Sequence, residues 1–308
     1  MPVATRMTGV LCPVITPFGE DLNPDAAMLT AQCRWLLSQG VGLAVFGTNS
    51  EANSLSVDEK MKLLIALAEN GIDVKRLMPG TGACALPDSV ALTRVAVKLG
   101  CSGALMLPPF YYKAVTDDGL FRYFSEVIEQ VGDTRLRVYL YHIPPVAQVG
   151  ISPDLIERLI KAYPDTIAGI KDSSGDWAYA ASLHARGWDN FSIFVGSETL
   201  LLQNMRAGGA GCISATANVN PAAIHALYEN WQADDADAAQ QALTDLRAIV
   251  QKQPMIAALK TIVANYSGLP GWQRLRPPLV ELTPSQKQTL LDELGKADFA
   301  MPGLGDNS

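Results

Sequence analysis

A lysine at the end of an apolar segment is the residue in this chain whose setting says most about chemistry. Residues 166–170 read Thr-Ile-Ala-Gly-Ile, and Lys171 follows them directly. A run this apolar is typical of a strand buried on both faces of a sheet. An ammonium at its carboxyl end would be partly desolvated, which lowers the pKa of a lysine, and the neutral amine could form a Schiff base with a carbonyl. The alternative is an ordinary lysine whose head reaches water or pairs with Asp172.

Polar groups also follow two earlier apolar runs. The segment Gly47–Glu51 is small and polar, and its amides and hydroxyls could hold a carboxylate. Tyr141 ends a later run and could relay protons, while His142 beside it could act in catalysis or line the substrate. Taken alone, residues 47–51 could be an ordinary polar loop, and Tyr141 could be a core tyrosine whose hydroxyl bonds the backbone.

Three further runs end in polar or aromatic residues. Tyr111 and Tyr112 could supply hydroxyls or pack as an aromatic patch at a subunit contact. Gly196–Glu198 and Ile213–Thr216 add small polar groups. An amine, proton-carrying hydroxyls and an anion-binding loop on one rim describe Schiff-base chemistry on a 2-oxo acid.

Eight short apolar runs, each followed by a segment of helical period, must position these groups. Roughly 30 residues separate successive runs, the length of one strand–helix unit. This α/β alternation favours a closed (β/α)8 TIM barrel, whose active sites lie at the carboxyl ends of the strands. No glycine-rich dinucleotide motif or P-loop follows a strand. The runs are Val10–Ile15, Gly42–Phe46, Leu77–Gly80, Gly103–Leu107, Leu136–Tyr141, Ile167–Lys171, Phe191–Gly196 and Gly211–Ala215.

Breaks and capping residues divide the chain. We expect the barrel to occupy residues 1–230, a C-terminal helical extension packed on it to occupy 231–300, and a frayed tail to occupy 301–308. Helices should begin with a capping residue and proline at Asn23-Pro24, Ser152-Pro153 and Asn220-Pro221, and with a capping box at Ser56-Val57-Asp58-Glu59.

Composition excludes several classes of function. The net charge of −7, without a basic run, argues against nucleic acid and anionic membrane surfaces as partners. No apolar segment reaches the ~18 residues that span a bilayer. The five scattered cysteines suit buried free thiols in a reducing compartment, and the three histidines lack metal-ligand spacing. With no signal-peptide pattern at the N-terminus, we expect a soluble, cytoplasmic protein.

Three motifs make the chain recognisable. Gly47-Thr48-Asn49-Ser50-Glu51 is similar to a G-[ST]-[TN]-G-E loop, and Tyr141-His142-Ile143-Pro144 is similar to Y-N-[IV]-P. The segment 169–176, Gly-Ile-Lys-Asp-Ser-Ser-Gly-Asp, matches G-[IL]-K-[DQ]-[ST]-S-G-D. In these motifs the chain resembles the family of N-acetylneuraminate lyase and dihydrodipicolinate synthase, pyruvate-dependent class I aldolases on a (β/α)8 barrel. The resemblance runs from about residue 9 to residue 279.

The resemblance implies roles for individual residues. Lys171 would be the Schiff-base lysine, and Tyr141 would move protons during imine formation and carbon–carbon cleavage. Thr48 and Asn49 would bind the carboxylate of the 2-oxo acid. Tyr111 would reach a neighbouring subunit's site and complete a hydroxyl relay with Tyr141 and Thr48, which implies a homo-oligomer, usually a dimer of dimers. No metal or organic cofactor is required.

The sequence departs from the family pattern at several positions. Ser50 stands in place of the loop's usual glycine, so the local backbone should differ, and His142 replaces an asparagine. Dihydrodipicolinate synthases carry an arginine shortly after the Y-N-V-P motif, whereas Pro145–Gly150 has no cation, which disfavours that activity. Thr199 stands where sialic-acid enzymes have a second acid, so sialic acid itself is a poor candidate substrate.

The favoured function is a lyase that cleaves or condenses a 4-hydroxy-2-oxo acid, such as a 2-keto-3-deoxy sugar acid, with pyruvate as product or donor. A Schiff-base dehydratase of a 2-keto-3-deoxy sugar acid would use the same residues. A non-catalytic ligand-binding barrel is disfavoured because Lys171 and Tyr141 are both present. Besides the catalytic residues, the substrate is expected to contact Gly47, Asn49, His142, Gly196, Glu198 and Ile213.

Overall fold

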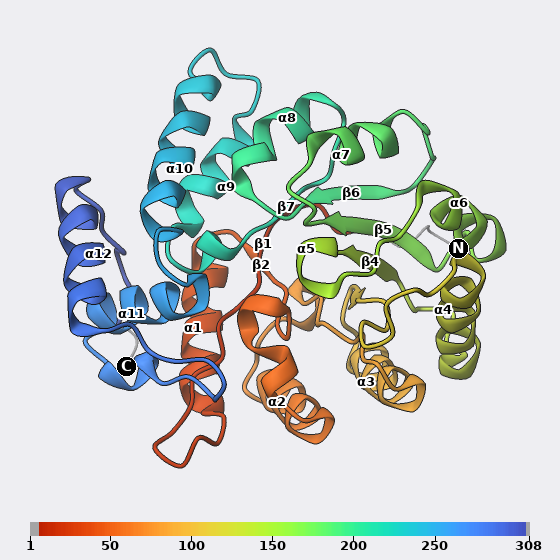
Figure 1. Ribbon diagram of the computed structural model, residues 1–308, viewed down its shortest axis with the longest axis horizontal. Helices are drawn as coiled ribbons and strands as arrows, with labels where there is room; N and C mark the ends of the chain where they lie inside the picture. Colours follow the sequence, from red (N-terminus) through yellow and green to blue (C-terminus); the bar gives the residue numbers. More distant parts are fainter. Residues whose placement is uncertain (1–5, 306–308) are drawn as a thin grey trace.

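Seven parallel strands form one curled sheet at the centre of the molecule, with helices on its outside (Figure 1). The computed structural model describes residues 6–305, so the first five residues of the expected barrel range and the last three of the expected tail lie outside it. The strand order is β2-β1-β7-β6-β5-β4-β3. The strands are β1 (Gly9–Cys12), β2 (Gly42–Leu43), β3 (Ala104–Met106), β4 (Val138–His142), β5 (Ile167–Asp172), β6 (Ser192–Val195) and β7 (Gly211–Ile213).

The third expected strand, residues 77–80, joins the two ends of this sheet. Leu77 forms an isolated parallel bridge with Leu43, and Gly80 forms another with Leu105. A Cβ on Gly80 would lie 2.1 Å from the Phe46 carbonyl oxygen, so the close approach of these two backbone segments requires glycine here. Among the described residues, the eight expected strands are therefore seven strands and one bridged segment.

Capping chemistry starts most of the helices as expected. Ser56 and Glu59 form a capping box, and Ser152 caps a helix that has proline in its first turn. The expectation for Asn23-Pro24 is wrong, because Asp25 is the N-cap and its carboxylate accepts from the Met28 amide. The helices around the sheet are α1 (Ala26–Ser38), α2 (Val57–Glu69), α3 (Leu86–Leu99), α4 (Asp117–Val131), α5 (Pro144–Ala147), α6 (Pro153–Ala162), α7 (Trp177–His184), α8 (Leu201–Arg206) and α9 (Pro221–Glu229).

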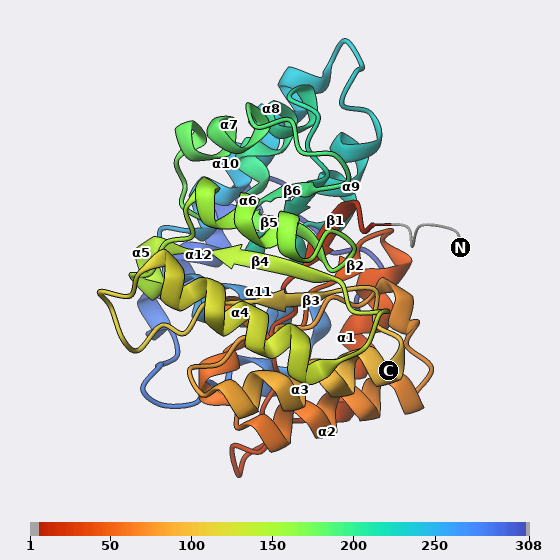
Figure 2. The same cartoon turned by 90° about the vertical axis from the view of Figure 1, so that its right-hand side faces the viewer.

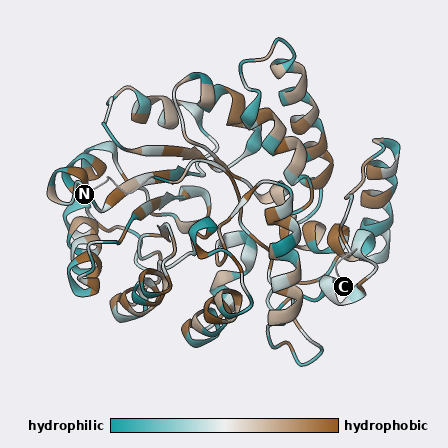
Figure 3. Ribbon diagram, turned by 180° about the vertical axis from the view of Figure 1, so that it is seen from behind, coloured by the Kyte–Doolittle hydropathy of each residue, from teal (hydrophilic) through white to brown (hydrophobic). Residues whose placement is uncertain are grey.

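Apolar side chains fill both sides of the strands. Tyr139 and Phe194 meet edge to face inside the curl, with ring centroids 6.0 Å apart, and both are fully buried. Burying each such ring contributes roughly 1.5–3 kcal/mol. Outside, α4 and α6 cover β4 and β5 (Figure 2), and the hydrophobic colouring concentrates on the strands and the inner helix faces (Figure 3). This packing fixes where each strand ends.

Three helices follow the last strand unit: α10 (Ala236–Val250), α11 (Met255–Ser267) and α12 (Pro284–Lys296). In Figure 1 they lie on the side of the molecule away from α4 and α6. The chain beyond them is packed rather than frayed up to residue 305, because Met301 is buried and the Trp35 indole donates to the Pro302 carbonyl. Within the described residues, no helix has the length and apolar character needed to cross a membrane.

Candidate active site

Lys171 and Tyr141 lie side by side near the carboxyl ends of two neighbouring strands. The register pairs Tyr141 of β4 with Lys171 of β5, and both residues are only 2 % exposed. The Lys171 Nζ lies 4.2 Å from the centre of the Tyr141 ring. The apolar strand thus carries an amine to the rim while packing on both faces hides it from bulk water.

Thr48 connects this pair to the polar loop after β2. Its Oγ1 shares a 3.1 Å hydrogen bond with the Tyr141 hydroxyl. Thr48–Ser50 forms a short 3-10 helix, and the Ser50 hydroxyl accepts a hydrogen bond of 3.1 Å from the Gly47 amide. The left-handed residue of the loop is Glu51, with φ 55°, and Ser50 itself does not adopt that conformation.

A buried ion pair anchors the same loop. The Lys260 ammonium, from α11, pairs with the Glu51 carboxylate, and both side chains are fully buried. Lys260 Nζ also donates to the Arg274 carbonyl at 2.7 Å and lies 4.4 Å from the centre of the Phe18 ring. Burial lowers the pKa of Lys260 to about 8, against the opposing pull of Glu51.

A cavity of about 300 Å³ opens over these groups. Its lining includes five of the expected site residues, namely Thr48, Asn49, Tyr141, Lys171 and Gly196. Asp172 and Ser173 also line it, as does Arg247 of α10. Burial raises the pKa of Asp172, whose carboxylate accepts from the Ser174 amide at 2.9 Å.

Glu198 does not line this cavity but lies just behind it. Its side chain is 1 % exposed and accepts hydrogen bonds from the hydroxyls of Ser214 and Thr216. It also accepts from Arg247 Nη1, at 2.7 Å. Arg247 was not expected at the site, because it comes from a segment that reads only as an amphipathic helix and reaches Glu198 through tertiary packing.

Comparisons with known proteins identify the family of the chain. A family model described as the dihydrodipicolinate synthetase family matches residues 6–297. The chain belongs to this family. It is 34 % identical over 279 residues to a DapA-like lyase of Chloroflexus aurantiacus, covering 89 % of this chain and 92 % of that one. The family resemblance expected from the motifs is thereby confirmed.

Solved structures of the dihydrodipicolinate synthetase family superpose closely. A dihydrodipicolinate synthase from Agrobacterium tumefaciens has a TM-score of 0.86 and 30 % identity, covering 94 % of this chain and 99 % of that one. A prophage protein of the same family from E. coli K12, solved in complex with pyruvate, has a TM-score of 0.84 and 26 % identity, with coverage of 95 % and 99 %.

His142 occupies a structural position in this family member. Its Nδ1 accepts a 3.0 Å hydrogen bond from the Ile151 amide, and its ring stacks on Tyr179 with centroids 4.0 Å apart. Burial lowers the pKa of His142 to about 4. The imidazole is therefore neutral at neutral pH, and it does not line the cavity of Lys171.

The remaining expected residues take different places. Ile213 is fully buried in the apolar interior of the curled sheet, and neither it nor Gly47 lines the cavity. Tyr111 is 74 % exposed, with its ring edge-on to Tyr112 at 5.4 Å. Within residues 6–305, Tyr111 makes no hydrogen bond with Tyr141 or Thr48.

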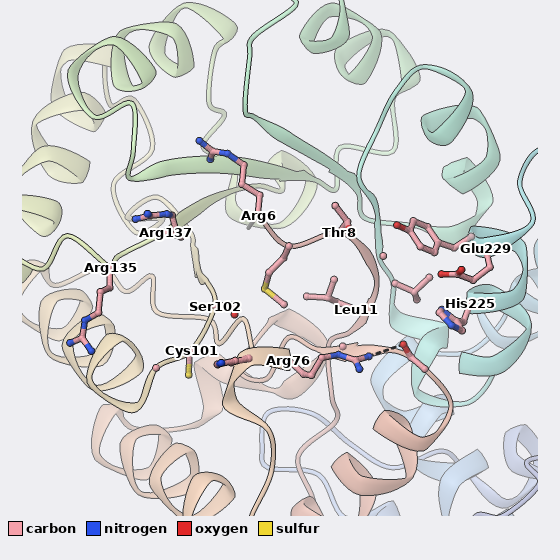
Figure 4. A pocket seen from close by; sticks show the side chains of 18 of the residues that line it. Arg6, Thr8, Leu11, Arg76, Cys101, Ser102, Arg135, Arg137, His225 and Glu229 are labelled. Carbon is pink, nitrogen blue, oxygen red and sulfur yellow. Dashed lines mark hydrogen bonds between the residues drawn. The ribbon is translucent and has the colours of Figure 1, made fainter. Parts of the chain in front are cut away.

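A larger cavity, of about 750 Å³, lies at the opposite, amino end of the strands (Figure 4). Arg6, Arg76, Arg135 and Arg137 surround it, and Lys171 is not part of its lining. Within residues 6–305, no group of three or more His, Cys, Asp and Glu side chains could hold a metal ion.

Proposed function

We propose that this protein is a Schiff-base-forming lyase that uses Lys171 to cleave or form a carbon–carbon bond in a 2-oxo acid. The observation that carries the proposal is the row Lys171, Tyr141 and Thr48, in which a buried amine lies against a phenol that is hydrogen-bonded to a second hydroxyl. Membership of the dihydrodipicolinate synthetase family and the likeness to a pyruvate-bound member support it.

The chemistry assigns one role to each group. The Lys171 amine adds to C2 of the 2-oxo acid, and Tyr141, with Thr48 behind it, carries protons as water leaves and an iminium forms. The Thr48–Asn49 loop holds the substrate carboxylate. The iminium accepts the electron pair of the C3–C4 bond as the 4-hydroxyl loses its proton, which releases an aldehyde. Protonation of the resulting enamine at C3 and addition of water then release pyruvate and free Lys171.

We propose a 4-hydroxy-2-oxo acid of the 2-keto-3-deoxy sugar acid type as substrate. Residues 145–150 contain no arginine or lysine, so the carboxylate of the aldehyde that a dihydrodipicolinate synthase condenses has no cation there. The lining of the cavity instead offers neutral donors in Asn49, Ser173 and Ser197. These suit hydroxyl groups.

We further propose that the sheet and its bridged segment act as a (β/α)8 barrel with a C-terminal helical extension, and that copies of it assemble as a dimer of dimers. The exposed Tyr111, Tyr112 and Val146 support an interface beside the cavity, which Val146 also lines. Tyr111 of one subunit would then reach the site of its neighbour.

Borohydride reduction in the presence of pyruvate tests the Schiff base. Peptide mass mapping is expected to find the reduced pyruvate adduct on Lys171 alone, and the adduct should vanish in Lys171→Ala. The exposed Lys161 provides the control, because Lys161→Ala should trap pyruvate as the wild type does. If no adduct forms on Lys171, the proposal is wrong.

Product analysis separates the lyase from the dehydratase. Incubation with 2-keto-3-deoxy sugar acids should release pyruvate together with an aldehyde. Loss of water with no pyruvate would assign the same Schiff base to dehydration instead.

A further inference from the structure

Arg247 brings the guanidinium that lines the Lys171 cavity, and its position is firmly set. It comes from α10, is 16 % exposed, and donates from Nη1 to Glu198 Oε2 at 2.7 Å and to the Ser214 hydroxyl at 3.2 Å. A second link holds the same helix, because Gln240 Nε2 donates to the Glu198 carbonyl at 3.0 Å. The guanidinium is therefore fixed in place before any substrate arrives.

Part of this guanidinium remains free to bind. Within residues 6–305, its Nε and Nη2 donate to no protein group, whereas the Glu198 carboxylate already accepts from Arg247, Ser214 and Thr216. Two other side chains that line the cavity, those of Asn49 and Ser173, make no hydrogen bond in the same range. The described site thus presents several unused N–H and O–H groups around one cavity.

The charge balance decides what these donors can hold. The Glu198 carboxylate neutralises Arg247, and the other acid close by, Asp172, adds negative charge to the same lining. Because Lys171 forms the bond to C2, a second carboxylate on the substrate would meet no uncompensated cation among the other side chains that line the cavity. Hydroxyl oxygens of a substrate would accept hydrogen bonds from Arg247 without the cost of placing a further negative charge beside Glu198 and Asp172.

We infer that Arg247, held by Glu198, binds the hydroxyl groups of the substrate's tail, and that the pair selects a 2-oxo acid with an uncharged, hydroxylated tail over one whose tail carries a second carboxylate. This inference rests on the proposed function and specifies the substrate class of that site. Glu198 acts as a positioning residue that both orients Arg247 and cancels its charge.

A matched series of substrates tests this selection. Five-carbon 4-hydroxy-2-oxo acids ending in CH₂OH, CH₃ or COO⁻ share the reacting atoms and differ only in the tail. The wild type should prefer the CH₂OH acid in kcat/KM. In Arg247→Met the ratio of kcat/KM for the CH₂OH acid to that for the CH₃ acid should fall about 10–100-fold, chiefly through KM, as the loss of a charged hydrogen bond predicts. Arg247→Lys should fall between.

Glu198→Gln gives the sharper readout. The amide keeps one acceptor oxygen, which can face Arg247 and Ser214, and turns an NH₂ donor toward the Thr216 hydroxyl, which can accept. The Arg247 charge is then unbalanced, so the ratio of kcat/KM for the diacid to that for the CH₂OH acid should rise about tenfold. Arg206→Met serves as the control, because Arg206 pairs with Asp237 on the surface and its loss should leave all the ratios unchanged.

Equal losses on all three substrates in the Arg247 variants, or no gain for the diacid in Glu198→Gln, would overturn the inference and show that the pair only ties α10 to the sheet. Borohydride trapping of pyruvate on Lys171 is measured in every variant. Intact trapping with unchanged ratios would reject the inference alone, whereas absence of trapping in the wild type would reject the proposed function.

Discussion

The two ends of the strands differ in a way that cavity size does not reveal. The larger cavity, at the amino ends, is surrounded by arginines that donate to backbone carbonyls: Arg6 to Ile167, Arg76 to Gly40 and Arg137 to Leu136. The smaller cavity, at the carboxyl ends, holds a buried amine beside a hydroxyl pair. A buried amine held beside hydroxyl groups therefore indicates an active site better than the volume of a cavity does.

Removing the Tyr141 hydroxyl, at the carboxyl ends of the strands, should have the largest effect on catalysis. Tyr141→Phe keeps the ring beside Lys171 Nζ but loses the oxygen bonded to Thr48, so kcat should fall about 10²–10⁴-fold, as expected for loss of a proton carrier. Steady-state release of pyruvate measures it. Tyr123→Phe is the control, because that hydroxyl bonds Ser89 and the Ala83 carbonyl away from the cavity. Equal activity in the two variants would contradict the assigned role.

His142 tests whether a buried residue near the carboxyl ends of the strands contributes to stability rather than to catalysis. Its pKa of about 4 in the folded state lies below the ~6.5 of an unfolded chain, so the unfolded state binds more protons between these values. The free energy of unfolding should fall by roughly 2–3 kcal/mol as the pH drops from 6.5 to 4, and be insensitive to this group above 6.5.

Urea unfolding of wild type and His142→Asn across this range provides the measurement. The variant should lose that part of the slope, so the two curves should converge toward pH 4. Curves that stay parallel would show that other groups set the acid sensitivity.

A change at the amino end should have the smallest effect on the reaction. The Arg137 guanidinium donates to the carbonyls of Thr134 and Leu136, so Arg137→Gln should cost at most about 1 kcal/mol of stability and change kcat/KM by less than about twofold. A tenfold loss of kcat/KM in folded protein would show that the two ends are energetically coupled.

The sequence predicts the site best where local pattern and strand register agree. Tyr141 and Lys171 each end an apolar run of the sequence, and the parallel register of the two neighbouring strands pairs them. Segment 77–80 is less regular than its apolar character indicates, because it touches each neighbouring strand through a single bridge.

Tertiary packing accounts for what the pattern misses. Glu198 looks like a substrate ligand because it follows a strand, yet the packing of α10 brings Arg247 between it and the cavity. The His142 position depends on an amide nine residues later, a contact that no periodicity encodes.

The buried pair of Lys260 and Glu51 has a consequence for protein engineering. Because α11 supplies the cation that pairs with Glu51 in the loop after β2, the helices after the sheet cannot be exchanged as an independent module. A recombinant chain joined after α9 to a foreign C-terminal segment would leave Glu51 buried without a counter-ion, at a cost of about 3–5 kcal/mol. Successful chimeras of this fold must inherit, together with the loop, a cation supplied by a helix near the C-terminal end of the chain.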